Sequence, residues 1–66
     1  MNLTINGKDQ EYSGSPTLAA LLDSLNLGGS RVVVELNGAI VGKPRHAATA
    51  VKDGDAVEIV RLVGGG

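Results

Sequence analysis

The chain of 66 residues contains no cysteine, tryptophan or phenylalanine, and only one histidine and one tyrosine. The absence of cysteine excludes disulfides, thiolate zinc sites and any thiol nucleophile or persulfide on the chain. Without large aromatic side chains the core must be aliphatic, and almost nothing is present to stack on a nucleic-acid base. One histidine and scattered acids are too few to predict a metal site.

An excess of charge of one sign is also missing, because 6 Lys and Arg stand against 7 Asp and Glu, for a net charge of -1. This balance argues against nucleic-acid binding and against polybasic attachment to a membrane. No apolar run approaches the ~20 residues of a membrane span. Residues 1–10 show neither the basic nor the apolar region of a secretory signal. We therefore expect a cytoplasmic protein with no membrane or nucleic-acid partner.

The size of the chain predicts a single domain over residues 1–66, monomeric when alone. Such a domain buries only about 60 % of the surface that its unfolded chain exposes. That leaves little room for an enclosed active site. No acid–base pair, Ser/His/Asp spacing or phosphate-binding glycine loop is present. The sequence therefore predicts a protein that is not an enzyme and binds no cofactor.

Five stretches have the composition of strands, four of them with alternating or largely apolar patterns. They lie at residues 1–6, 9–12, 32–36, 39–41 and 57–62. An Asn-Gly pair follows the first and the third stretch and predicts a tight hairpin, since both residues tolerate positive φ. We expect a turn at 53–55, and a loop with one helical turn at 42–50.

One helix of about 11 residues is predicted between the second and third strands, because four leucines recur with helical spacing. We expect Ser15 to cap it, Pro16 to take its first position, and Gly28-Gly29 to end it with a left-handed cap. The order of elements predicts an α+β fold, with a mixed sheet of about five strands and one helix packed on one face. The helical leucines are Leu18, Leu21, Leu22 and Leu25.

Three glycines, Gly64, Gly65 and Gly66, follow the last predicted strand almost directly and point most clearly to a function. A segment without side chains is thin and flexible, and three residues extend ~10 Å. It can enter a narrow channel in another protein while the domain stays outside. Its one chemical group is the α-carboxylate of Gly66. The alternative is a frayed terminus or a linker remnant.

Three outward-facing apolar residues, Val33, Val60 and Leu62, form the second candidate feature. If their strands are neighbours, they make an exposed apolar patch of the kind that marks interaction sites. Scattered surface aliphatics are the alternative. The basic run at 43–46 reads as a solvated loop, and its single histidine predicts no metal site.

The order of elements and three local motifs resemble the ubiquitin-like β-grasp fold, and within it the sulfur carrier family of thiamine biosynthesis, ThiS. The motifs are Leu-Asn-Gly at 36–38, Asp-Gly-Asp at 53–55 and the glycine end at 64–66. Their combination at this length carries the resemblance, which covers the whole chain. It departs from the family where Gly42-Lys43 stand in place of a Pro-Arg pair, which comes two residues later.

The resemblance implies a carrier whose Gly66 carboxylate is adenylated by an E1-like enzyme with ATP and magnesium. A sulfur donor, a cysteine desulfurase or a related relay, would then form a thiocarboxylate for delivery to thiazole synthase. Gly64 and Gly65 would thread the tail into each active site, and the patch of Val33, Val60 and Leu62 would dock the domain. Two alternatives stay open: a carrier like the small subunit of molybdopterin synthase, and a ubiquitin-like modifier or interaction module.

Overall fold

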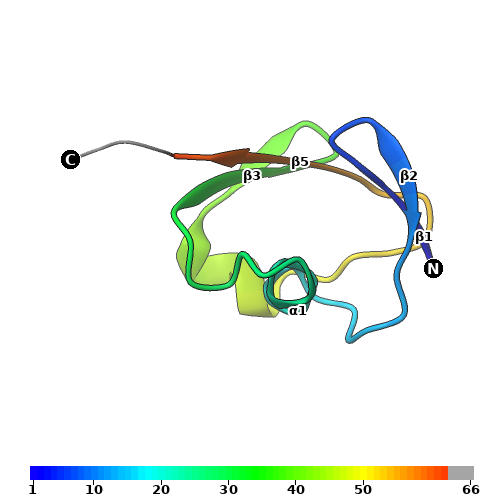
Figure 1. The fold of residues 1–66 in the computed structure, drawn as a ribbon, viewed down its shortest axis with the longest axis horizontal. Coiled ribbons are helices and arrows are strands. Elements are labelled where there is room, and N and C mark those ends of the chain that lie inside the picture. The colour runs from blue at the N-terminus through cyan, green and yellow to red at the C-terminus, as the bar shows by residue number, and fades with distance from the viewer. Residues whose placement is uncertain (63–66) are drawn as a thin grey trace.

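The computed structural model describes residues 1–62, in which one helix packs across a single five-stranded sheet (Figure 1). The strand order is β2-β1-β5-β3-β4, with β1 and β5 parallel and the other neighbours antiparallel. The predicted mixed sheet with one covering helix is thus confirmed. Its elements are β1 (Asn2–Ile5), β2 (Lys8–Glu11), α1 (Leu18–Ser24), β3 (Val32–Leu36), β4 (Ala39–Val41), the 3-10 helix η1 (Lys43–Ala48) and β5 (Ala56–Arg61).

Both predicted Asn-Gly hairpins are present. In each of them, the turn requires residues that tolerate positive φ. Asn6 and Gly7 have φ of 51° and 82°, and Asn37 and Gly38 have φ of 50° and 88°. Two successive residues at positive φ match the twist of the flanking strands, which favours Asn followed by Gly. The polar strand β2 therefore folds back on β1, and β4 folds back on β3.

The core lies between the inner face of the sheet and the leucine stripe of α1. Leu3, Val34, Val57 and Leu18 are fully buried there, and Leu21 and Leu22 are nearly so. Alternate residues of each central strand face the helix, as the alternation in the sequence predicts. The aliphatic character of the core is confirmed, except for the ring of Tyr12 at its edge.

The helix begins later than predicted, and Ser15 does not cap it. Thr17 is the N-cap, and its hydroxyl accepts a hydrogen bond from the Ala20 N–H. The preceding residues instead pair with a distant segment: the Leu18 N–H donates to the Thr49 carbonyl, and the Val51 N–H donates to the Pro16 carbonyl. This pairing holds Pro16 in an extended strap outside the helix, so the helix has 7 residues.

The helix also ends earlier than predicted, and Asn26 rather than Gly28-Gly29 supplies the left-handed residue. Asn26 has φ of 62°. Its N–H donates to the Asp23 carbonyl, and the Leu27 N–H donates to the Leu22 carbonyl. These two bonds form a Schellman motif, which satisfies the last carbonyls of the helix. Asparagine is the commonest substitute for glycine at this position, because its short polar side chain tolerates positive φ.

A buried carboxylate ties the β3–β4 turn to the start of β5. The Asn37 amide donates to Asp55 through Nδ2 and accepts from the Ala56 N–H through Oδ1. Asp55 also accepts from the Lys52 N–H at 2.8 Å. Burial raises the pKa of Asp55, but the bond from Asn37, the bond from Lys52 and the Lys52 charge outweigh it, so the pKa lies below its ordinary value of 3.8.

We expect Asn37→Gly to destabilise the fold by about 1–3 kcal/mol, because it removes two hydrogen bonds around a buried carboxylate. Glycine tolerates the same positive φ, so the change measures only the contribution of the Asn37 side chain to stability. Asn26→Gly is the matched control: it also replaces an asparagine at positive φ, and no side-chain bond of Asn26 is recorded within residues 1–62. Denaturant unfolding of both variants measures the difference, and equal midpoints would contradict the role of the amide.

The same network has a consequence for acid stability. A depressed pKa in the folded state means that Asp55 contributes stability above about pH 4, which is lost as the pH falls through the folded value. Removing the Asn37 amide takes away the largest favourable contribution. The pKa of Asp55 in the Asn37→Gly variant is therefore expected to rise, which an NMR titration of that carboxyl group measures.

Candidate functional site

The outer face of the sheet, turned away from α1, brings the three predicted patch residues together. Val33 lies directly opposite Val60 in the β3–β5 register, and such opposed residues share a face. Val60 is 58 % and Leu62 55 % exposed, while Val33 is half-buried between neighbouring strands. The Leu62 N–H donates to the Arg31 carbonyl at 2.8 Å, which holds this residue beside the start of β3.

Sequence reasoning missed a fourth residue of this face, Ile40. It is the most exposed large apolar side chain of the described part, at 70 %. Its register partner is Glu35, which in turn lies opposite Glu58, so these side chains form one row across β4, β3 and β5. The sequence did hold a signal for it, because side chains alternate between the two faces of a strand. Ile40, at the centre of a three-residue strand, therefore faces away from its neighbours Ala39 and Val41. We call Val33, Ile40, Val60 and Leu62 the apolar patch from here on.

The predicted threading and sulfur-carrying residues, Gly64, Gly65 and Gly66, lie outside the described residues. The structure places the residues just before them, because β5 ends at Arg61 and the Leu62 N–H donates to the carbonyl of Arg31, the residue before β3. The apolar patch lies on β3, β4 and β5, and β5 is the strand that precedes residues 64–66 in the sequence.

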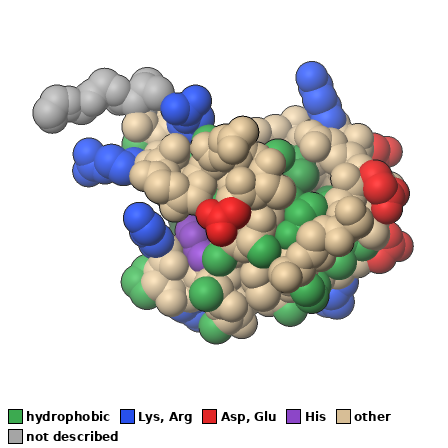
Figure 2. Space-filling model, turned by 60° about the horizontal axis from the view of Figure 1, so that its bottom comes forward, with side chains coloured by type: hydrophobic (Ala, Val, Ile, Leu, Met, Phe, Trp, Pro, Cys, Tyr) green, Lys and Arg blue, Asp and Glu red, His purple; other side chains and the backbone are tan. Residues whose placement is uncertain are grey.

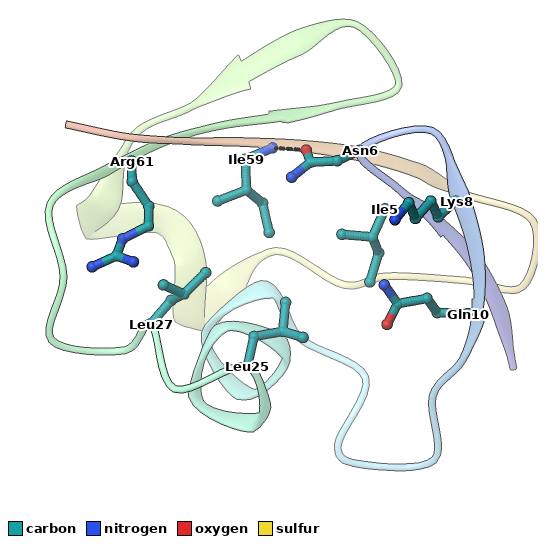
Figure 3. Close-up of a pocket in the computed structure, with 8 residues that line it drawn as sticks. All are labelled: Ile5, Asn6, Lys8, Gln10, Leu25, Leu27, Ile59 and Arg61. Atoms are coloured by element: carbon teal, nitrogen blue, oxygen red, sulfur yellow. Dashed lines mark hydrogen bonds between the residues drawn. The ribbon is translucent and has the colours of Figure 1, made fainter. Parts of the chain in front are cut away.

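A hollow of about 420 Å³ opens between the C-terminal end of α1 and the inner face of the sheet (Figure 3). Its polar groups are two amides and two cations, and the Asn6 amide is engaged by the Ile59 N–H at 2.7 Å. A catalytic pocket needs a group that can take a proton or attack a substrate. The lining holds no carboxylate, imidazole, hydroxyl or thiol: it consists of Ile5, Asn6, Lys8, Gln10, Leu25, Leu27, Ile59 and Arg61.

The single histidine is a structural residue of η1. His46 is 6 % exposed, and its Nε2 lies 3.0 Å from the Val41 carbonyl oxygen. Within residues 1–62, no three His, Asp or Glu side chains come together as a metal site would require. Among the helices that the structure describes, none has the length and apolarity to cross a membrane.

Comparison with known proteins gives one consistent result. Residues 3–66 match the ThiS family. The chain is 42 % identical to the sulfur carrier protein ThiS of Bacillus subtilis, over 97 % of this chain and 98 % of that one. The crystal structure of the thiamine biosynthesis protein ThiS from Geobacter metallireducens matches it over the full length of both chains, with 43 % identity and a TM-score of 0.84. This likeness confirms the predicted ubiquitin-like β-grasp fold.

A different arrangement is found in the thiazole synthase of Paramagnetospirillum magneticum. It is 47 % identical to the whole of this chain, but the aligned segment is only 20 % of that protein. The chain thus spans about a fifth of the length of this relative. A segment similar to the entire chain is joined there to a much longer polypeptide.

Proposed function

This chain belongs to the ThiS family, and from that premise we propose that it carries sulfur for thiamine biosynthesis as a thiocarboxylate on Gly66. It is a carrier and not a catalyst. The observation that supports this most directly is the similarity over nearly the full length of the Bacillus subtilis sulfur carrier. The match to the family extends through residue 66 and so includes the glycine end.

The chemistry begins with activation of the Gly66 carboxylate, because a carboxylate is a poor electrophile. In the proposal, an E1-like enzyme with ATP and magnesium directs a carboxylate oxygen to the α-phosphorus, and pyrophosphate leaves. The terminal sulfur of a persulfide on the sulfur donor, a cysteine desulfurase or a related relay, then attacks the acyl carbon and displaces AMP. A second cysteine thiol of the donor or of the activating enzyme cleaves the resulting acyl disulfide and is oxidised to a disulfide, which leaves a thiocarboxylate at Gly66. Since the chain has no cysteine, it cannot hold the transferred sulfur as a persulfide. Because adenylation consumes ATP, the proposal places the carrier in the cytoplasm.

Thiazole synthase is the proposed acceptor of the sulfur. The thiazole synthase of Paramagnetospirillum magneticum contains a segment similar to this whole chain, so carrier and synthase sequences occur there in one polypeptide. A covalent connection of this kind suits two units that must meet repeatedly, because it raises their effective concentration. The same association between separate chains is proposed for this protein.

The apolar patch is the proposed docking surface for both the adenylating enzyme and thiazole synthase. Exposed aliphatic residues that gather on one face of a sheet mark an interaction site more often than isolated ones do. The patch lies on β3, β4 and β5, and β5 leads directly to the tail. We propose that the two partners bind this face in turn, so a stable complex of all three through it would contradict the proposal.

Loading with sulfur in a purified system tests the function. The chain is incubated with the E1-like enzyme, ATP, magnesium and a sulfur donor, and its intact mass is measured without reductants or amines. The expected product is heavier by one exchange of sulfur for oxygen, mapped to Gly66. A protein modifier would instead gain a protein through an amide bond, and a plain interaction module would gain nothing.

A charge placed in the apolar patch should weaken docking. We expect Val60→Asp to raise the Kd for the adenylating enzyme at least about tenfold, because a carboxylate buried in an apolar interface loses its hydration. Gln10→Asp is the matched control, since it adds the same charge to an exposed residue of β2, away from the patch. Calorimetric titration gives both constants. If the two variants bind equally, the partner does not cover Val60.

A further inference from the structure

Basic residues gather at the end of the molecule where β5 finishes. Arg61 is the last residue of β5, and Arg31 lies beside Leu62 through the bond from its carbonyl to the Leu62 N–H. Lys43 is the second residue after β4. Val41 lies opposite Val34 in the antiparallel β3–β4 pair, so the chain at Lys43 comes close to Val32, the first residue of β3. Arg45 lies two residues further along η1, about 4 Å by the rise of a 3-10 helix. We call these four residues the basic collar.

Four of the seven acidic residues gather at the opposite end. The Asn2 N–H donates to Asp53, and Asn2 lies opposite Glu11 in the β1–β2 register. Asp9 and Asp55 lie near them, opposite Thr4 and beside the start of β5. Figure 2 shows this bias, with Lys and Arg side chains mostly at the end where β5 finishes and a group of Asp and Glu side chains at the other, while one acidic group lies in the middle of the face beside the histidine. The chain is nearly neutral overall, yet its charges are separated along its length.

The collar is exposed and forms no ion pair in the described part of the chain, although the Asp23 carboxylate lines the same shallow hollow as Lys43. All four side chains are exposed. The one ion pair recorded within residues 1–62 joins the N-terminal ammonium to Glu11, at the far end. Cations that repel one another on a small domain are a cost to the fold. An acidic surface that covers them on binding removes that repulsion.

We propose that the basic collar docks on an acidic rim around the channel that admits the tail, and that the charge separation turns the carrier tail-first as it approaches. This inference rests on the proposed function, because it assumes that a partner receives the tail. Beyond the proposed function, it predicts that the partner's surface around the channel is acidic. A field of this kind raises association rates by about 10- to 1000-fold at low ionic strength.

The four residues after Leu62 allow the acidic rim and the reacting Gly66 carboxylate to lie at different places in the partner. The four residues that follow Leu62 span at most ~14 Å, so the Gly66 carboxylate can react well beyond the collar. The collar then meets the entrance of the channel rather than the nucleotide at its far end. Nucleic acid is a poorer fit for the same cations. The net charge is -1, and the chain has a single aromatic residue to stack on a base, the buried Tyr12.

Association kinetics with the purified E1-like enzyme test the proposal, using the full chain and two charge reversals. Arg31→Glu alters the collar, whereas Lys52→Glu alters the opposite end, where the Lys52 backbone binds Asp55. Each replaces a cation with an anion and takes the net charge from -1 to -3. We expect Arg31→Glu to slow association about tenfold at low salt and much less at high salt, where the Debye length is short. Lys52→Glu should stay within about twofold of the unaltered chain.

Three results would overturn the proposal: equal slowing by both reversals, no salt dependence in the unaltered chain, or faster association of Arg31→Glu. If Lys52→Glu lowers the melting temperature through its proximity to Asp55, the pair Arg31→Gln and Lys52→Gln gives the same comparison. Sulfur loading of the unaltered chain is measured in parallel. Failure to load would contradict the proposed function, whereas the rate comparison decides the charge of the rim separately.

Discussion

A single lysine added after Gly66 is expected to abolish thiocarboxylate formation and leave the fold unchanged. The added residue converts the Gly66 carboxylate into an amide, which cannot attack the α-phosphorus of ATP. It also presents a bulky side chain where the proposed channel is shaped for glycine. The core residues of the domain, such as Leu18 and Val57, lie within residues 1–62, so the addition removes no core contact. Mass spectrometry after incubation with the E1-like enzyme, ATP and a sulfur donor measures the loss.

The control for this experiment is the same protein after removal of the extra residue. Carboxypeptidase B takes off a C-terminal lysine and regenerates the Gly66 carboxylate. Loading should then return to the level of the unaltered chain, which excludes damage to the domain as the cause. Normal loading of the extended protein would refute the role of the Gly66 carboxylate.

Leu18→Ala is expected to destabilise the domain by about 2–5 kcal/mol, the cost of a large-to-small change in a packed core. Leu18 is fully buried and is the first residue of α1. A small domain has only about 5–15 kcal/mol of stability in total, so such a variant loses a large share of it. Chemical denaturation followed by circular dichroism gives the change in midpoint.

Leu62→Ala is the matched control for the core substitution. It deletes the same atoms from a leucine that is 55 % exposed on the outer face of the sheet. Its effect on stability should stay within about 0.5 kcal/mol, as for most surface substitutions. If the two variants unfold at the same denaturant concentration, the assignment of the inner and outer faces is wrong.

Local sequence determines most of this fold. The two Asn-Gly pairs set both hairpins, because few other residue pairs hold φ near 50° and then above 80° at low cost. Alternation in β3 and β5 sets which residues face the helix, and hence which form the apolar patch. These features depend on near neighbours in the chain, so a pattern of a few residues is sufficient to predict them.

The sequence-based predictions were wrong where hydrogen bonds from distant segments replace those that the local pattern would make. Ser15-Pro16 has the local pattern of a helix start, but residues 49–51 take the hydrogen bonds of this segment and move the start to Leu18. Asp55 looks like a turn residue, yet it is buried because Asn37 and the Lys52 N–H satisfy its carboxylate. Both outcomes depend on residues at least 18 positions away, or on a network of several groups, so local patterns cannot reveal them.

The position of β5 between β1 and β3 also has a consequence for biosynthesis. β1 pairs with β5 across almost the whole length of the chain, with Thr4 beside Ala56. The β1–β2 and β3–β4 hairpins cannot join into one sheet before β5 has been synthesised and has left the ribosome, and such long-range pairing slows folding. The chain therefore completes its sheet only when nearly all of it has been made. Under the proposed docking mode, a partner that recognises side chains from β3, β4 and β5 together would discriminate against nascent and truncated chains, and activation would be restricted to carriers that have finished folding.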